Sequence, residues 1–458
     1  MLTLTKVPDA QSDSREAVDR NHICRYACEH RYPIPVGQPR VYKRRFNQGG
    51  TLGVVLVLLT LALLPVAIPS PALAGQLHHY EYVFPDNSIY VYDMDNRGAL
   101  VKHVVVPTSA GVRGAVASTV TGMLYISYGS DRRSGGSMLK YDLMTDEVVW
   151  AKHYPFGVDS MSISPDGKTI YMPTGELGSG GIWKVIDANT GNVTTSIDSG
   201  GIGPHNTVVS PDGARVYLGP RYTNYLVVAS TRTNQVIRKI GPVGGVGGIR
   251  PFTINGAQSL AFITLSGFLG FQVGDISTGR ILYTVPVQGF PGGGRAVSAP
   301  SHGISLSPDE KEVYLIDSIN NYVHVFDVTG LPGSAPRQVA DIRLLGALSR
   351  NESPCAYDCL RDGWLHHSRD GRYVFVGDSG DVIDTTLRKT AMTLPALANS
   401  RKEIEIDFED RVPLPTWAMN NRSSIGDRAP GVRSLPFSGA ADAVPTDLQM
   451  GAMSGTGA

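Results

Sequence analysis

The sequence predicts an all-β protein whose strands form a ring of repeated antiparallel sheets, a seven-bladed β-propeller. Three observations carry this prediction. A turn-and-strand motif recurs along the chain, a second motif ends in aspartate at nearly regular intervals, and 52 glycines and 30 prolines occur among 458 residues. This composition is typical of many short strands joined by tight turns.

The first repeat is a Ser-Pro-Asp-Gly turn followed by an apolar strand that contains an aromatic residue. Four clear copies and two degenerate ones begin at Ser164 (SPDGKTIYM), Ser210 (SPDGARVYL), Ser307 (SPDEKEVYL), Ser368 (SRDGRYVFV), Gly122 (GMLYIS) and Asn255 (NGAQSLAFIT). Proline presets the backbone for a turn and glycine accepts the conformation that closes it. Each copy therefore predicts a chain reversal that leads into a strand.

The second repeat is an alternating strand that ends in aspartate, with one serine in the same place. The seven end positions are Asp93, Asp142, Asp187, Ser230, Asp275, Asp327 and Asp384, spaced 49, 45, 43, 45, 52 and 57 residues apart. A four-stranded propeller blade needs about 45 residues. A β-sandwich, the alternative, has no reason to repeat the same turn at such intervals. Seven four-stranded antiparallel blades are therefore expected.

The two ends of the repeat region complement each other. The segments Tyr80–Phe84 (YEYVF) and SIYVYD match the second and third strands of later units, so the first unit lacks its innermost strand. The late segment Lys402–Phe408 (KEIEIDF) is an alternating strand without a unit of its own. Because an exposed sheet edge invites aggregation, we expect this strand to complete the first blade and close the ring.

The segment before the propeller has the pattern of a secretory signal peptide. Lys43–Arg45 precede an apolar core of 13 residues, Leu52–Leu64, and the small-residue site Ala72–Ala74 follows it. The core is short for a bilayer span, which needs about 20 residues. Cleavage near Ala74 and a periplasmic or secreted protein are expected, and a retained membrane anchor is the alternative.

The sequence thus divides into four parts: a polar leader (1–48), a signal peptide (49–74), the propeller (75–410) and a Pro/Gly/Ser/Ala-rich tail (411–458) that is expected to be disordered. The leader is unusually long, and a true start near Val41 would explain it.

Removing residues 1–74 takes away nine basic and five acidic side chains. The 41 basic and 41 acidic side chains of the whole chain then become 32 and 36. This net charge of −4 argues against nucleic-acid binding, which needs clustered Lys and Arg.

The turn-and-strand repeat, the strands ending in aspartate and the Thr-Gly-x-Val hairpins resemble the YVTN-type repeats of YncE-like seven-bladed propellers, over nearly all of residues 76–410. The stretch Gly203–Gly213 is also similar to the lactonase and cycloisomerase branch of these propellers. The first resemblance implies a scaffold that binds a ligand or partner. The second implies an enzyme for lactone hydrolysis or cyclisation, and some YncE-like propellers suggest nucleic-acid binding.

Polar side chains should converge on a funnel, because inner strands start and second strands end on the same face of a propeller. His205 and His302, like Asp159, lie five residues before the first residue of their turns, and His367 lies one residue before Ser368. The second strands end at Glu176, Arg221, Asp317 and Asp378.

Three interpretations of this rim remain open. The side chains either satisfy loop backbone groups, or bind a small molecule whose anionic group Arg221 holds, or bind copper, zinc or iron through His205, His302 and His367. No HExxH or CxxCH motif supports the metal. The leading hypothesis is a monomeric scaffold that binds a small molecule or protein, with membrane contact only through a retained signal segment. The alternative is an enzyme, lactonase-like or a metal-dependent oxidoreductase.

Cys355 and Cys359 (CAYDC) lie in an insertion before the last unit. Two cysteines so close in an exported protein are expected to form a disulfide. A copper or redox role together with His366 and His367 is the alternative.

Overall fold

The computed structural model describes residues 77–130, 135–244, 248–292, 298–356, 359–409 and 412–413. The chain separates into two compact units, Met1–Pro71 and Ala72–Ala458, and every described residue belongs to the second. The leader, the signal peptide and nearly all of the tail lie outside the described residues. Within the described ranges, no helix is long and apolar enough to cross a membrane.

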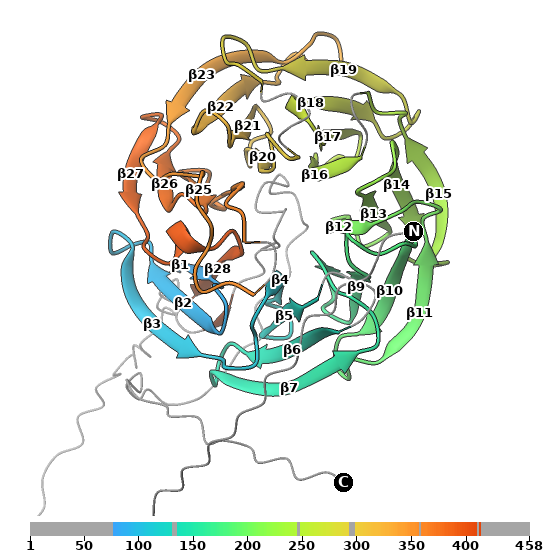
Figure 1. Ribbon diagram of the computed structural model, residues 1–458, viewed down its shortest axis with the longest axis vertical. Helices are drawn as coiled ribbons and strands as arrows, with labels where there is room; N and C mark the ends of the chain where they lie inside the picture. The colour runs from blue at the N-terminus through green and yellow to red at the C-terminus, as the bar shows by residue number, and fades with distance from the viewer. Residues whose placement is uncertain are drawn as a thin grey trace, which may run out of the picture. The chain divides into compact units, whose positions relative to one another are not determined.

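Seven antiparallel sheets surround a central axis, which confirms the predicted seven-bladed propeller (Figure 1). From the inner strand outward, the first blade consists of β28 (Glu403–Glu409), β1 (Leu77–Val83), β2 (Ser88–Asp93) and β3 (Ala99–Val105), the second of β4 (Val112–Ser118), β5 (Met123–Gly129), β6 (Gly136–Asp142) and β7 (Glu147–Tyr154), and the third of β8 (Ser162–Ile163), β9 (Thr169–Pro173), β10 (Ile182–Asp187) and β11 (Val193–Asp198). The fourth consists of β12 (Pro204–Val209), β13 (Arg215–Pro220), β14 (Leu226–Ser230) and β15 (Gln235–Ile240), and the fifth of β16 (Ile249–Ile254), β17 (Leu260–Leu265), β18 (Phe268–Asp275) and β19 (Ile281–Pro286). The sixth consists of β20 (Ile304–Leu306), β21 (Glu312–Asp317), β22 (Tyr322–Asp327) and β23 (Arg337–Arg343), and the seventh of β24 (Trp364–His367), β25 (Tyr373–Gly377), β26 (Asp381–Asp384) and β27 (Lys389–Thr393).

The late strand closes the ring as predicted. β28 pairs antiparallel with β1 over seven residues, from Leu77 opposite Glu409 to Val83 opposite Glu403, and so becomes the inner strand of the first blade. Figure 1 shows the two strands side by side although they come from opposite ends of the described chain. A further short strand, β29 (Val412–Pro413), pairs with the other edge of β28, and a 3₁₀ helix, η2 (Leu397–Asn399), precedes β28.

The apolar core is divided among the contacts between blades. Seven clusters of buried apolar side chains occur among the described residues, and each cluster combines residues of two neighbouring blades. Between the fourth and fifth blades, for example, Tyr217 packs with Phe252 and Ile263. Because both faces of each sheet are covered in this way, strands such as β12 are buried at every position, whereas the outer strand β15 is largely exposed.

The two faces of the closing strand differ in chemistry. Ile404, Ile406 and Phe408 pack against the second blade. The alternate residues are acidic and buried, namely Glu403, Glu405 and Asp407, together with Glu81 on β1. We call these four carboxyl groups the seam acids. They face the last blade, because His366 on β24 lies 3.2 Å from Glu81 and 3.4 Å from Glu403, and the backbone N–H of Arg369 donates to Glu405.

Burial changes the proton affinity of these groups. It raises the pKa of Glu403 to about 7 and that of Asp407 to about 6, and it raises the pKa of Glu405 well above its ordinary value. Burial opposes protonation of His366, but Glu81 and Glu403 outweigh it and raise the His366 pKa to about 10. The folded chain therefore binds more protons at the seam than the unfolded chain does between about pH 5 and 9.

The seam should consequently lower the free energy of unfolding as pH rises from 5 to 9, because the folded chain retains protons there that the unfolded chain has already released. The urea midpoint is expected to be highest near pH 5, and Glu405→Gln should make its decline with pH shallower. The exposed Glu147→Gln is the matched control and should leave the slope unchanged. A midpoint that rises steadily over this range would contradict the assignment.

Candidate functional site

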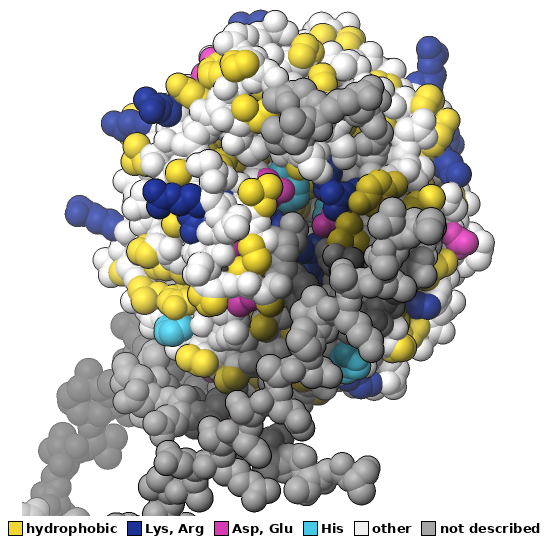
Figure 2. Space-filling view, in the orientation of Figure 1, with side chains coloured by type: hydrophobic (Ala, Val, Ile, Leu, Met, Phe, Trp, Pro, Cys, Tyr) yellow, Lys and Arg dark blue, Asp and Glu magenta, His cyan; other side chains and the backbone are white. Residues whose placement is uncertain are grey.

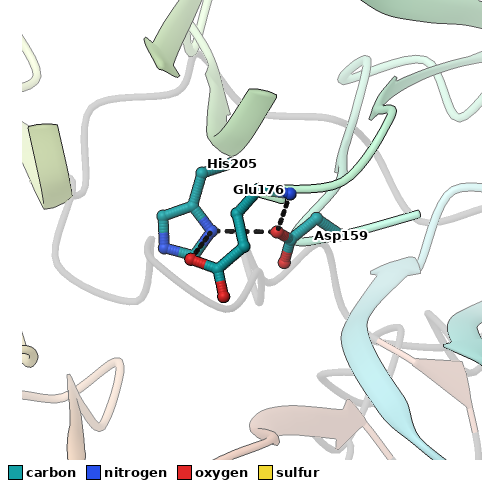
Figure 3. A group of neighbouring side chains, drawn as sticks. All are labelled: Asp159, Glu176 and His205. Carbon is teal, nitrogen blue, oxygen red and sulfur yellow. Dashed lines mark hydrogen bonds and ion pairs between the residues drawn. The ribbon is translucent and has the colours of Figure 1, made fainter. Parts of the chain in front are cut away.

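The centre of the site is a buried group of two carboxylates and one histidine. Asp159 precedes β8, Glu176 follows β9, and His205 lies near the start of the inner strand β12. His205 Nδ1 is 3.0 Å from Asp159 Oδ2 and 3.8 Å from Glu176 Oε2 (Figure 3). Sequence reasoning placed all three at the funnel, and the structure brings them together.

Backbone groups fix Asp159 in this arrangement. The N–H of Ser160 donates to Oδ1 (2.9 Å), and the N–H of Glu176 donates to Oδ2 (3.2 Å). A carboxylate only accepts, so Nδ1 of His205 carries a proton and donates it to Asp159. Nε2 of His205 is buried and has no hydrogen-bond partner among the described residues. This nitrogen therefore offers a lone pair to a bound molecule.

Three arginines surround the carboxylates. Arg113 on β4 lies 3.3 Å from Asp159 and 3.2 Å from Glu176. Arg221, after β13, is 2.5 Å from Glu176, and Arg250 on β16 is 3.4 Å from the same oxygen, Oε2. Three positive charges thus meet two negative ones, and with His205 counted as neutral the group carries a surplus of one positive charge.

Arg221 and Arg250, which we call the arginine pair, share a second partner. Both donate to the hydroxyl of Ser298, Arg221 over 3.3 Å and Arg250 over a shorter contact. Arg250 also donates to Ser266 (3.1 Å). The two guanidinium groups are therefore held beside one another by neutral hydroxyls and one carboxylate, an arrangement suited to an additional anion.

Arg113 and Arg250 were missed by sequence reasoning, although the repeat contains the signal for both. Their turns are the degenerate ones, and the turn residues equivalent to Ser164 are Ser118 and Asn255. Asn255 N donates to Leu260 O as Ser164 N donates to Thr169 O, which fixes the equivalence in the fifth blade. Both arginines lie five residues before these positions, as His205 does before Ser210. Applying the same count to the degenerate turns would have found them.

His302 precedes β20, two blades further along the chain than His205, and the ring centroids of the two histidines are 6.5 Å apart. Its Nδ1 donates to the carbonyl oxygen of Gly363 (2.8 Å), so Nε2 keeps its lone pair. Burial, together with the nearby charges of Arg401 and Arg250, lowers the pKa of His302 well below its usual range. His302 is therefore a neutral acceptor on this side of the funnel.

Asp378 belongs to the network beside His302. Its Oδ2 accepts the N–H of Gly363 (3.1 Å) and lies 3.6 Å from Nη1 of Arg401. The same Nη1 is 2.8 Å from Asp362. Arg401, which sequence reasoning did not single out, precedes β28, so ring closure delivers it to the funnel. Figure 2 shows charged and histidine side chains gathered in the central hollow of this face.

Asp317 and His367 are used elsewhere. Asp317 accepts the N–H groups of Ile319 and Asn320 and contacts His324 (3.2 Å), so it stabilises a turn within the sixth blade. His367 contacts the Ser305 hydroxyl (2.8 Å) and packs edge-on against Tyr314, and burial lowers its pKa to about 3. His367 lies four positions along the chain from the funnel-end residue Gly363, roughly 13 Å at about 3.3 Å per residue.

The suggested metal set of His205, His302 and His367 is therefore not assembled. In the part of the chain that the structure describes, the group with suitable metal-ligand spacing is Asp159, Glu176 and His205, whose ligand atoms lie within 4.8 Å of one another. Its two carboxylates are already neutralised by three guanidinium groups. The charge balance thus favours an anion over a metal cation at this place.

Cys355 and Cys359 form a disulfide with a Cα–Cα distance of 5.7 Å. The loop that contains them bridges the two ends of the ring, since Ala356 N donates to Asp86 of the first blade (2.7 Å) and Ser353 N donates to Asn399 after the last (2.8 Å). His366 contacts the seam acids instead of this loop.

Comparison with known proteins assigns the chain to no family. No family model matches the chain, and no curated protein matches it in sequence. Among solved structures, it is similar to hydrazine synthase of Kuenenia stuttgartiensis, at 16% identity and a TM-score of 0.44, over 68% of this chain and 85% of that one. It is also similar to the β-propeller domain of Cps50 (Swd1) from Myceliophteria thermophila, at 10% identity and a TM-score of 0.47, over 62% and 86%. Neither likeness bears on function.

Proposed function

We propose that the chain is an exported, YncE-like propeller that binds a small organic anion in its central funnel. The propeller supplies a rigid scaffold, but function has to be argued from the site that it holds. Export is supported by the sequence pattern of residues 1–74, and the relation to YncE-like proteins by the repeats. N-terminal sequencing of the mature protein tests export, which predicts a first residue near Gly75.

The single observation that carries the proposal is the arginine pair. Arg221 and Arg250 share Glu176 Oε2 and the Ser298 hydroxyl, and Arg113 adds a third positive charge to the same carboxylate. Two guanidinium groups at one place repel each other unless anions lie between them. An anionic ligand that displaces the Ser298 hydroxyl would gain charge-assisted hydrogen bonds from both.

The two histidines complete the proposed site. His205 and His302 both present Nε2 as an acceptor, and their ring centroids lie 6.5 Å apart. A ligand with a hydroxyl or N–H group beside its anionic group could therefore donate to either ring. Neither histidine requires protonation for this role, because Asp159 and the Gly363 carbonyl fix the proton on Nδ1.

Binding of a small anion should depend on Arg250. Titration of the purified chain with acetate or inorganic phosphate is expected to show saturable binding that Arg250→Gln weakens by about ten- to hundredfold, the range for losing hydrogen bonds to a charged group. Arg250→Lys should recover part of the affinity, because it keeps the charge.

The exposed Arg238→Gln on β15 is the matched control and should bind as the unaltered chain does. Urea unfolding of each variant separates lost binding from lost folding. Equal affinity in Arg250→Gln and in the unaltered chain would overturn the proposed site.

A second candidate function is hydrolysis or cyclisation of a lactone, and one observation favours it. The Asp159–His205 pair, with a proton on Nδ1 and a buried, unpartnered Nε2, is the arrangement of a general base oriented by a carboxylate. The arginine pair would then stabilise the developing oxyanion. Lactone turnover that His205→Gln abolishes while anion binding persists would establish the enzyme. Absence of lactone turnover in the unaltered chain would exclude this enzyme and leave the anion-binding scaffold as the proposed function.

A further inference from the structure

Three large apolar side chains lie exposed beside the arginine pair. Leu177 directly follows Glu176, Tyr222 directly follows Arg221, and Ile202 lies three residues before His205. Their exposed fractions are 40%, 54% and 49%, respectively. We call Leu177, Ile202 and Tyr222 the rim patch. Leu177 and Tyr222 are thus bonded directly to residues of the site, and Ile202 belongs to the loop that leads to His205.

The loops that carry the rim patch meet at one point. Tyr222 N donates to Ile202 O (3.0 Å), and Arg221 N donates to Gly203 O (2.7 Å). A Cβ on Gly203 would lie 2.6 Å from the Glu176 carbonyl oxygen and 2.7 Å from Cδ2 of Tyr222. Gly203 also has a φ of +73°, which favours glycine. The three apolar side chains therefore come from segments packed against one another.

Tyr222 joins the rim patch to the charged site. The Arg221 guanidinium lies 5.3 Å from the centre of the Tyr222 ring, within the range of a cation–π contact. More than half of this tyrosine is nevertheless exposed. One side chain thus orients a ligand-binding arginine and still offers apolar surface.

We infer that the ligand is an amphipathic organic anion, whose charged group binds the arginine pair and whose apolar body lies on the rim patch. This inference rests on the proposed anion site and names the class of its ligand. The positive charges of the arginine pair attract the anionic end of such a ligand. The apolar body attached to that end would then contact the neighbouring rim patch. Figure 2 shows hydrophobic side chains directly beside charged ones around the central hollow. Exposed apolar surface next to converging polar groups marks a binding site.

A series of carboxylates of increasing length tests this inference. Calorimetric titration of the full chain with acetate, butyrate and hexanoate should show an affinity that rises about threefold per methylene, and so roughly hundredfold from acetate to hexanoate. Hexan-1-ol, which lacks the charge, should bind at least about tenfold more weakly than hexanoate.

The double variant Leu177→Asn/Ile202→Asn should lose most of the dependence on chain length while it binds acetate normally. Val105→Asn/Ile237→Asn is the matched control, because these side chains are also large, apolar and exposed (55% and 53%) but lie on the outer strands β3 and β15. The control should keep the full dependence on length. Both double variants should unfold at the urea concentration of the unaltered chain.

The possible failures are distinct. If no carboxylate of the series binds, the proposed anion site and this inference are both wrong. If acetate and hexanoate bind equally well, the anion site stands and the amphipathic ligand is excluded. If the dependence on length survives in Leu177→Asn/Ile202→Asn, the apolar body does not lie on the rim patch.

Discussion

The pairing of β28 with β1 is the contact on which the rest of the molecule depends. Seven twisted sheets enclose a common axis when no sheet is left with a free inner edge, and seven backbone pairs supply that edge in the first blade. Once the ring is closed, every inner strand begins at the same end of the channel. Arg113, His205, Arg250 and His302 then converge although as many as 189 residues separate them along the chain.

Convergence determines the chemistry of the centre. The blades bury apolar side chains against their neighbours, so polar groups at the strand ends find partners mainly in one another. Charges that are shielded from water interact strongly, and the network is correspondingly dense around Glu176, which three arginines contact. A molecule that enters this space is therefore recognised first by its charge and then by its shape.

Much of this could be predicted from the sequence. The repeated turns and the strands ending in aspartate were sufficient for blade number, strand order and ring closure, because these follow from local patterns. The position five residues before each clear turn predicted Asp159 and His205 at the site. Arg113 and Arg250 were not predicted, because the turns that follow them lack the Ser-Pro-Asp-Gly sequence. His367 was wrongly predicted at the funnel. It lies at the far end of its inner strand, four positions after the funnel-end residue Gly363, and residue type alone does not indicate the position along a strand.

Each apolar cluster belongs jointly to two blades, and this sharing restricts how such a protein can evolve. A duplication that inserts one more blade replaces one existing contact with two new ones, and both must pack well at once. The contact between the first and last blades adds a further requirement, because buried acids there pair with His366 beside the apolar cluster. The apolar clusters between blades thus constrain the number of blades, whereas the polar residues of the channel lie outside these clusters and constrain one another instead.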